Sequence, residues 1–102
     1  MNRGEVWWVE HPEEGRRPAL ILTRAEAIPL LRKVLVVPAT RTRREIPSEV
    51  LLDEEDGMPA ACALSFDNLR VVPKAMLTER VARLGVERMA EVCTALRSAT
   101  GC

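Results

Sequence analysis

The feature that most limits the fold of this chain is a series of short apolar segments separated by polar turns. Segments rich in β-forming residues cover 5–9, 18–23, 33–39, 49–52, 61–66 and 69–72. Turn formers such as Pro12, Gly15 and the pair Asp67-Asn68 stand between them. Several short strands with few helices predict a small, strongly bent antiparallel sheet or barrel.

The strands differ in their expected places. The third, 33–39, is almost continuously apolar and should be central. The second begins at Pro18, where a missing N–H is tolerated. We expect loops at 10–17 and 40–45, a solvated acidic turn at 53–57, and a short helical turn at 24–31 that Pro29 disturbs. The segment 77–84 fits a strand or a helix, and its spacing does not decide between them.

The last segment has a helical period. Val86, Met89, Cys93 and Leu96 fall on one helical face with Val92 beside them, and the opposite face is mostly charged. Gly85 stands at the N-cap position and Gly101 can end the helix. The sequence therefore predicts one domain over 1–102, mainly β with a C-terminal α-helix.

Composition removes several classes of protein. The longest apolar runs, 18–22 and 34–39, are too short to cross a bilayer. The first residues lack a signal peptide's apolar stretch, because Arg3 and Glu5 interrupt it, so we expect a cytoplasmic protein without a membrane partner. The three cysteines include no C-x-x-C pair, which predicts reduced thiols rather than a disulfide scaffold or zinc knuckle: Cys62 and Cys93 buried, Cys102 exposed.

Most familiar catalytic motifs are absent. His11 is the single histidine, so one chain cannot supply a two-histidine acid–base pair. The sequence has no G-x-G-x-x-G, Walker loop or H-E-x-x-H. The acidic run 53–56 reads as a solvated loop rather than a cation site. We expect no metal and no cofactor.

The basic residues are the more informative group. The formal net charge is zero, and of 15 basic residues only Lys33 and Lys74 are lysines. Arginine offers a flat fork of donors that grips a phosphate with two bonds, which lysine cannot do. An arginine excess also arises from GC-rich coding, so the placement of the arginines has to decide.

Two segments of the chain place arginines next to a hydroxyl. If the second and third predicted strands are antiparallel neighbours, Arg17 at the start of one lies beside Thr40 at the end of the other. A cationic fork beside a hydroxyl, within a basic loop, suits a phosphodiester. The alternative is structural: Arg17 forms a salt bridge with Glu13 or Glu14, and Thr40 caps a turn.

Four motifs occur together in one order along almost the whole chain: RGEVWWV at 3–9, GRRPALIL at 15–22, VVPAT at 36–40 and FDNLR at 66–70. With the pair Leu84-Gly85 before the final helix, they resemble the MazF/PemK/Kid family of toxin endoribonucleases. The resemblance implies an SH3-like small β-barrel of the CcdB/PemK type and a homodimer. It also implies metal-independent, sequence-specific cleavage of single-stranded RNA by the toxin of a toxin–antitoxin pair.

The resemblance also implies residue roles. Arg17 and Thr40 match the family's catalytic pair, for attack of a ribose 2′-OH on the adjacent phosphorus, leaving a 2′,3′-cyclic phosphate and a 5′-OH. Arg17 would neutralise charge on the phosphorane and Thr40 would donate a hydrogen bond, whose loss costs roughly 3 kcal/mol, on the order of a hundredfold in rate. A MazE-like antitoxin with an acidic disordered tail is the expected inhibitor. The expected RNA-binding residues are Arg16, Arg41, Thr42, Arg43, Arg44, Ser48, Asp67 and Asn68, of which the last three are base readers or ordinary turn residues.

The sequence departs from the family pattern at two places. The loop 10–16 is short and lacks the Gly-Ser-Glu stretch that many relatives carry, so RNA recognition should differ. Within it, His11 is either a compensating proton donor in contact with RNA or an exposed loop histidine. The pair Ala61-Cys62 stands where many members have Asp-Ser, which affects strand pairing or dimer contacts.

Two tryptophans stand side by side in the first strand. Trp7 and Trp8 point to opposite faces, so one should fill the core. The other is an interface residue or an RNA-stacking surface, and we favour the interface because a large exposed apolar group usually has a partner.

Two rival functions fit the same chain. One is a gyrase-poisoning toxin like the CcdB proteins, which resemble this family in fold but cut nothing. The other is an RNA-binding module without cleavage, which would bind with steep salt dependence yet release no cyclic-phosphate ends.

Overall fold

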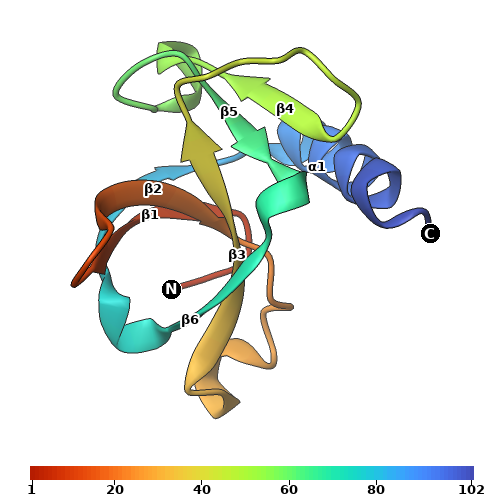
Figure 1. Ribbon diagram of the computed structural model, residues 1–102. Coiled ribbons are helices and arrows are strands. Elements are labelled where there is room, and N and C mark those ends of the chain that lie inside the picture. Colours follow the sequence, from red (N-terminus) through yellow and green to blue (C-terminus); the bar gives the residue numbers. More distant parts are fainter.

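A computed structural model describes residues 1–102 as one bent antiparallel sheet with a helix against it (Figure 1). The strand order is β4-β5-β3-β2-β1-β7, and β6 pairs with β3 beside this path. The mainly β fold with a C-terminal helix is confirmed. The elements are β1 (Glu5–His11), β2 (Gly15–Ile21), β3 (Lys33–Thr40), β4 (Glu49–Leu52), β5 (Cys62–Ser65), β6 (Arg70–Pro73), β7 (Leu77–Arg83) and α1 (Val86–Thr100).

The sheet is bent but does not close into a barrel. β4 and β7 are its two ends, and they do not pair with each other. α1 packs against β4 and the 3₁₀ helix Phe66–Asn68, so a helix rather than a closing strand covers this end of the core (Figure 1). Of the two expected forms, a strongly bent sheet or a small barrel, the structure has the open, strongly bent sheet.

The predicted loop 10–17 is mostly strand. β1 runs to His11 and β2 begins at Gly15, with Glu10 opposite Arg16 in the ladder. Gly15 has a φ of +83°, which a side chain would disfavour, and this allows the tight connection. Hydrophobic spacing missed these residues because their side chains face solvent while their backbones pair.

The central strands bury residues on both faces. Leu20 and Val37 belong to a core cluster of 15 buried residues, whereas their neighbours Ile21 and Val36 belong to a second cluster of 7. Because side chains alternate along a strand, β2 and β3 lie between the two clusters and each contributes residues to both. This arrangement explains the almost unbroken apolar run of β3 and confirms its central place.

The ambiguous segment 77–84 is a strand because it pairs with β1 over Glu5–Arg83 to Val9–Leu77. The predicted turn 24–31 contains a 3₁₀ helix at Ile28–Leu30, with Pro29 inside it. The predicted acidic turn holds a 3₁₀ helix at Glu54–Asp56. That turn is not merely solvated, because Asp56 accepts hydrogen bonds from Arg88 of α1.

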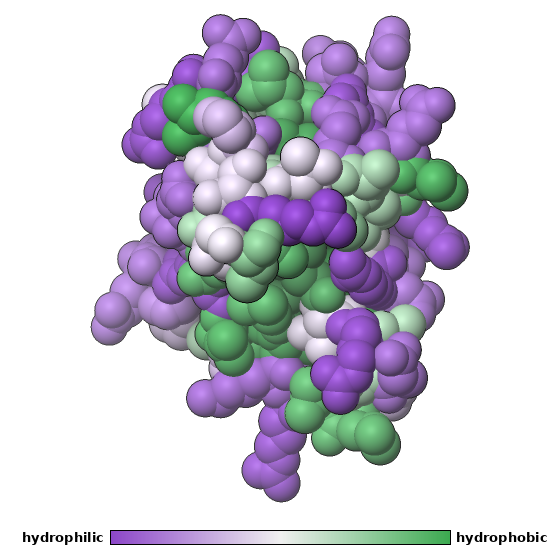
Figure 2. Space-filling model, turned by 90° about the vertical axis from the view of Figure 1, so that its right-hand side faces the viewer, coloured by the Kyte–Doolittle hydropathy of each residue, from purple (hydrophilic) through white to green (hydrophobic).

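The buried face of α1 differs from the predicted one. Val92 and Ala95 are buried, Met89 and Leu96 pack against the core while partly exposed, and Val86 is 89% exposed. Cys93 is only half-buried, although Cys62 is buried and Cys102 exposed as expected. On the side of the molecule that carries α1, apolar patches alternate with hydrophilic side chains (Figure 2). No helix has both the length and the apolar character to span a membrane.

Candidate active site

Arg17 and Thr40 meet where β2 begins and β3 ends. The pairing of the two strands ends at Ala19 opposite Pro38, two residues short of Arg17 on β2 and of Thr40 on β3. Both residues line two adjoining pockets. The first, of about 420 Å³, is called here the Trp8 pocket, and the second, of about 580 Å³, the Asp67 pocket. The structure thus brings the two sequence-predicted residues to the border of both pockets.

Arg17 has no carboxylate partner. Its side chain is exposed, and no ion pair within 4.0 Å involves it. Glu14, which was one expected partner, pairs with Arg70, and the hydrogen bond from Arg70 lowers the pKa of the Glu14 carboxyl. The structural alternative for Arg17 is therefore wrong: its guanidinium is available to a ligand.

Thr40 does cap a turn, yet its hydroxyl keeps a donor. Thr40 Oγ1 accepts a hydrogen bond from the backbone N–H of Thr42 at 3.2 Å. That bond uses an oxygen lone pair and leaves the hydroxyl hydrogen unused, since a threonine hydroxyl both donates and accepts. The bond also orients the half-buried side chain. Capping and donation to a ligand are compatible here.

The Trp8 pocket combines aromatic, apolar and cationic groups. Arg16 lies over the Trp8 ring, 4.1 Å from its centroid, and its Nη2 donates to Glu79 Oε2 at 3.0 Å. The apolar side of the pocket comes from the segment 58–62, and Arg41 stands at its rim. Burial raises the pKa of the Cys62 thiol in this wall, so that thiol stays protonated.

The Asp67 pocket is polar. Asp67 and Asn68 line it, and both are held by hydrogen bonds: Ser48 Oγ donates to Asp67 Oδ2 at 2.6 Å, and Asn68 Nδ2 donates to Ser65 Oγ at 2.7 Å. Ser48 itself is buried and is absent from the pocket lining. The structure thus places Ser48 behind Asp67.

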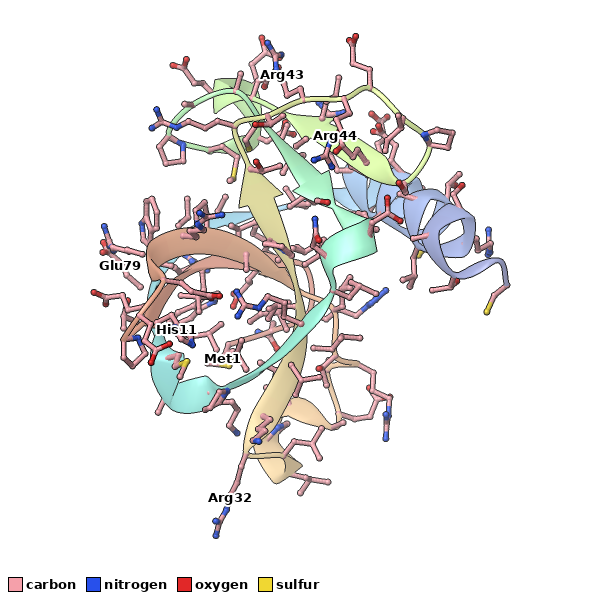
Figure 3. The ribbon with its side chains drawn as sticks, viewed as in Figure 1. Met1, His11, Arg32, Arg43, Arg44 and Glu79 are labelled. Carbon is pink, nitrogen blue, oxygen red and sulfur yellow. The ribbon has the colours of Figure 1, made fainter.

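The arginine run after β3 spreads over both pockets. Arg41 lines the Trp8 pocket, Thr42 lines both pockets, and Arg44 lines the Asp67 pocket. The Arg44 backbone N–H donates to the buried Glu49 at 2.9 Å, which fixes the loop. Figure 3 shows Arg43 at the outer rim of this loop and Arg44 nearer the strands, and Arg43 lines neither pocket.

His11 and Arg70 complete the surroundings. His11 Nδ1 accepts the backbone N–H groups of Glu13 and Glu14, both at 3.1 Å, so this nitrogen caps the hairpin turn. Arg70 lines the Asp67 pocket and a small third pocket that Arg17 and His11 share. Sequence reasoning omitted Arg70 from the site, although it ends the motif FDNLR. No group of three or more His, Cys, Asp or Glu side chains is close enough to hold a metal ion.

Comparison with known proteins supports one family. The family model described as "PemK-like, MazF-like toxin of type II toxin-antitoxin system" matches residues 2–100. The chain is 46% identical over 101 residues to "Probable endoribonuclease MazF5" of Mycobacterium tuberculosis, covering 98% of this chain and 93% of that protein. It is 41% identical over 103 residues to "Probable endoribonuclease MazF2" of the same species, covering 100% of both chains.

Solved structures agree with this assignment. The "Mycobacterium tuberculosis toxin MazF-mt6" superimposes with a TM-score of 0.88 at 28% identity, covering 95% of this chain and 96% of that one. An "Endoribonuclease in complex with its cognate antitoxin from Mycobacterial species" gives 0.88 at 27% identity, covering 99% and 95%. The chain therefore belongs to the PemK-like, MazF-like toxins of type II toxin–antitoxin systems.

Proposed function

We propose that this toxin is a metal-independent endoribonuclease and that Arg17 and Thr40 carry its reaction. The observation behind the proposal is that an exposed guanidinium without a carboxylate partner and a threonine hydroxyl line the same two pockets. A planar cationic fork matches the geometry of a phosphate. Two relatives that match over almost their full length are named probable endoribonucleases, which indicates RNA as the substrate.

The reaction is an internal transfer within RNA. The ribose 2′-oxygen attacks the adjacent phosphorus, the bond to the 5′-oxygen breaks, and the products are a 2′,3′-cyclic phosphate and a free 5′-OH. The 2′-hydroxyl loses its proton, and the departing 5′-oxygen gains one. Arginine stays protonated in proteins, so Arg17 acts by stabilising the negative charge of the pentavalent phosphorane. Thr40 donates its free hydroxyl hydrogen to a phosphate oxygen.

The two pockets hold the nucleotides on either side of the cleaved bond. Arg41, Thr42 and Arg44 contact the backbone, and Asp67 and Asn68 read base edges in the polar pocket. The buried Ser48 contributes by orienting Asp67 rather than by touching a base. The other expected contacts keep supporting roles: Arg16 beside Trp8, Arg43 at the rim, and His11 in the third pocket.

The test is cleavage of RNA in the presence of EDTA. We expect cleavage to persist with the chelator, to produce 2′,3′-cyclic phosphate and 5′-OH ends, and to disappear in Arg17→Ala. RNA that stays intact while gyrase stalls would overturn the proposal in favour of a gyrase poison. RNA that is bound with steep salt dependence but stays uncut would overturn it in favour of a binding module.

The surface that carries the Trp8 pocket and the Asp67 pocket is also the site we propose for an inhibitor. A solved relative is described as an endoribonuclease in complex with its cognate antitoxin, and another structure as MazE-MazF. The arginine run 41–44 fits an acidic, disordered antitoxin tail that folds on binding and excludes RNA. Charge reversal in Arg43→Glu/Arg44→Glu should weaken antitoxin binding. Unchanged affinity would show that the tail binds elsewhere.

In this proposal the toxin acts in the cytoplasm, where single-stranded RNA is exposed. It acts there as a homodimer. Sedimentation at micromolar concentration tests the assembly. A single monomeric species would contradict the dimer and leave the cleavage reaction unaffected.

A further inference from the structure

The two tryptophans of β1 have separate environments. Trp7 packs against the second core cluster and its Nε1 donates to the buried Glu5 at 3.0 Å. Trp8 is also partly covered, but its ring lines the pocket that Arg17 and Thr40 share. Neither tryptophan is among the exposed large apolar side chains. The reason for expecting one of them in a protein interface, a large exposed apolar group, is therefore absent.

The pocket beside Trp8 suits a flat ligand. Arg16 lies over the ring, with its guanidinium carbon 4.1 Å from the ring centroid. Aromatic rings and arginine planes are the two surfaces on which unstacked bases of single-stranded RNA stack. Met58 and Pro59 give the same pocket apolar walls. Its volume of about 420 Å³ lies within the roughly 300–1,000 Å³ typical of small-molecule sites.

The contact that holds Arg16 is a weak one. The Arg16–Glu79 pair is 3.0 Å long, but the two side chains are 45% and 69% exposed. Exposed ion pairs contribute little to stability because solvent screens them. Figure 3 shows Glu79 at the outer edge of the molecule, near the β1–β2 hairpin. Arg16 can therefore shift along the ring, or stay as a layer of the stack, without a large penalty.

We propose that Trp8 and Arg16 form a stacking subsite for the base of a nucleotide next to the cleaved phosphate. The inference rests on the proposed function, because it takes the phosphate between Arg17 and Thr40 as its reference point. The subsite accepts any base, since every base has a flat face and stacking does not read edges. Sequence selection then falls to the polar Asp67 pocket on the other side of that phosphate.

Fluorescence gives a direct readout. The chain has two tryptophans and no tyrosine, so Trp7→Phe leaves Trp8 as the only strong emitter. The probe is a short single-stranded RNA with 2′-fluoro sugars, which lacks the attacking hydroxyl and cannot be cut by the proposed reaction. We expect this probe to quench Trp8 in Trp7→Phe. An abasic oligomer of the same length should bind without quenching.

Affinity separates stacking from a structural role. Trp8→Ala should weaken binding of the base-containing probe roughly tenfold or more, and leave binding of the abasic oligomer unchanged. Trp7→Phe is the matched control, and its affinity for both probes should equal that of the wild type. A merely structural tryptophan would affect both probes equally.

The outcomes that overturn the subsite are distinct from those that overturn the proposed function. Binding of the base-containing probe without quenching of Trp8, or equal losses for both probes in Trp8→Ala, overturns the subsite alone. Conversion of the protein to monomers by Trp8→Ala also overturns it and assigns Trp8 to an interface. Failure of the wild-type protein to cut RNA overturns the proposed function, whatever the fluorescence shows.

Discussion

Two arginines of this chain, Arg88 and Arg17, show that the same type of side chain has two different roles. Arg88 on α1 donates from Nε to Asp56 Oδ1 at 3.0 Å, from Nη2 to Oδ2 at 3.2 Å, and from Nη1 to Glu91. Arg17 on β2 has no carboxylate within ion-pair distance and lines three pockets. The chain is neutral overall, with 15 basic and 15 acidic residues, so the difference comes from where the carboxylates lie. Arg88 thus joins α1 to the acidic turn, whereas the guanidinium of Arg17 remains available to a ligand.

The strongest test of this contrast is removal of Arg17. Arg17→Ala should lower the rate of RNA cleavage on the order of a thousandfold or more, because a guanidinium that stabilises transition-state charge at phosphorus is lost. Its stability should stay near that of the wild type, since no ion pair is broken. Single-turnover cleavage and urea unfolding measure the two quantities.

Arg88→Ala is the matched variant at the paired site. It should lose stability and keep its cleavage rate under conditions where it remains folded. Equal losses of activity in the two variants at 25 °C, with both folded, would contradict the division into structural and ligand-binding arginines.

The next largest effect should come from Thr40. Thr40→Val keeps the shape of the side chain and removes the hydroxyl, so we expect a loss of cleavage on the order of a hundredfold. Thr40→Ser keeps the hydroxyl and should stay within a few fold of the wild type. Both rates come from the same single-turnover assay. If the valine variant cleaved as fast as the serine variant, the hydroxyl would have only its capping role toward Thr42.

The sequence predicted most strand positions because their signal is local. β4 was predicted with its observed bounds, and Gly85 and Gly101 flank α1 as expected. The end of the β1–β2 hairpin, residues 10–17, was predicted as a loop because Glu10 and Arg16 pair through their backbones while their side chains resemble those of loop residues. Segment 77–84 needed the partner strand β1 to decide between strand and helix, and such long-range pairing leaves no trace in local spacing.

The site was predictable where it depended on strand neighbours and not where it depended on side-chain partners. The proximity of Arg17 to Thr40 followed from antiparallel neighbours. The pairing of Glu14 with Arg70 did not, because the two residues are far apart in sequence and their proximity depends on how the sheet bends. For the same reason, the sequence placed Trp7 and Trp8 on opposite faces but could not say which of them faces the pocket.

The stability that the Asp56–Arg88 pair provides should depend on pH and should fall when Asp56 is replaced. Burial by itself raises the pKa of Asp56, but the hydrogen bonds from Arg88 and from the Asp53 backbone outweigh it, and the pKa is lowered. A lowered folded-state pKa adds stability above the unfolded pKa of about 4, which is lost as the pH falls through the folded value. Asp56→Asn should therefore cost about 1–3 kcal/mol at neutral pH.

Urea unfolding of the wild type and Asp56→Asn, at neutral pH and at a pH below the folded-state pKa of Asp56, tests this sign. The difference between the two proteins should shrink in acid, because the wild-type carboxyl then becomes neutral as well. A difference that stays constant with pH would mean that Arg88 gains nothing from the charge of Asp56.

The smallest effect on RNA binding should come from Arg43, at the rim of the loop that follows β3. Arg43 lines neither pocket, so Arg43→Ala should weaken binding of uncleavable RNA only a few fold. It should also reduce the slope of log affinity against log salt by about 0.7, the value for one phosphate contact on a single strand. Arg24→Ala provides the matched control, since Arg24 is exposed and already 3.7 Å from Glu26. If both variants kept the wild-type slope, the phosphate contacts would be limited to the arginines inside the two pockets, and the ligand-binding region would end at their walls.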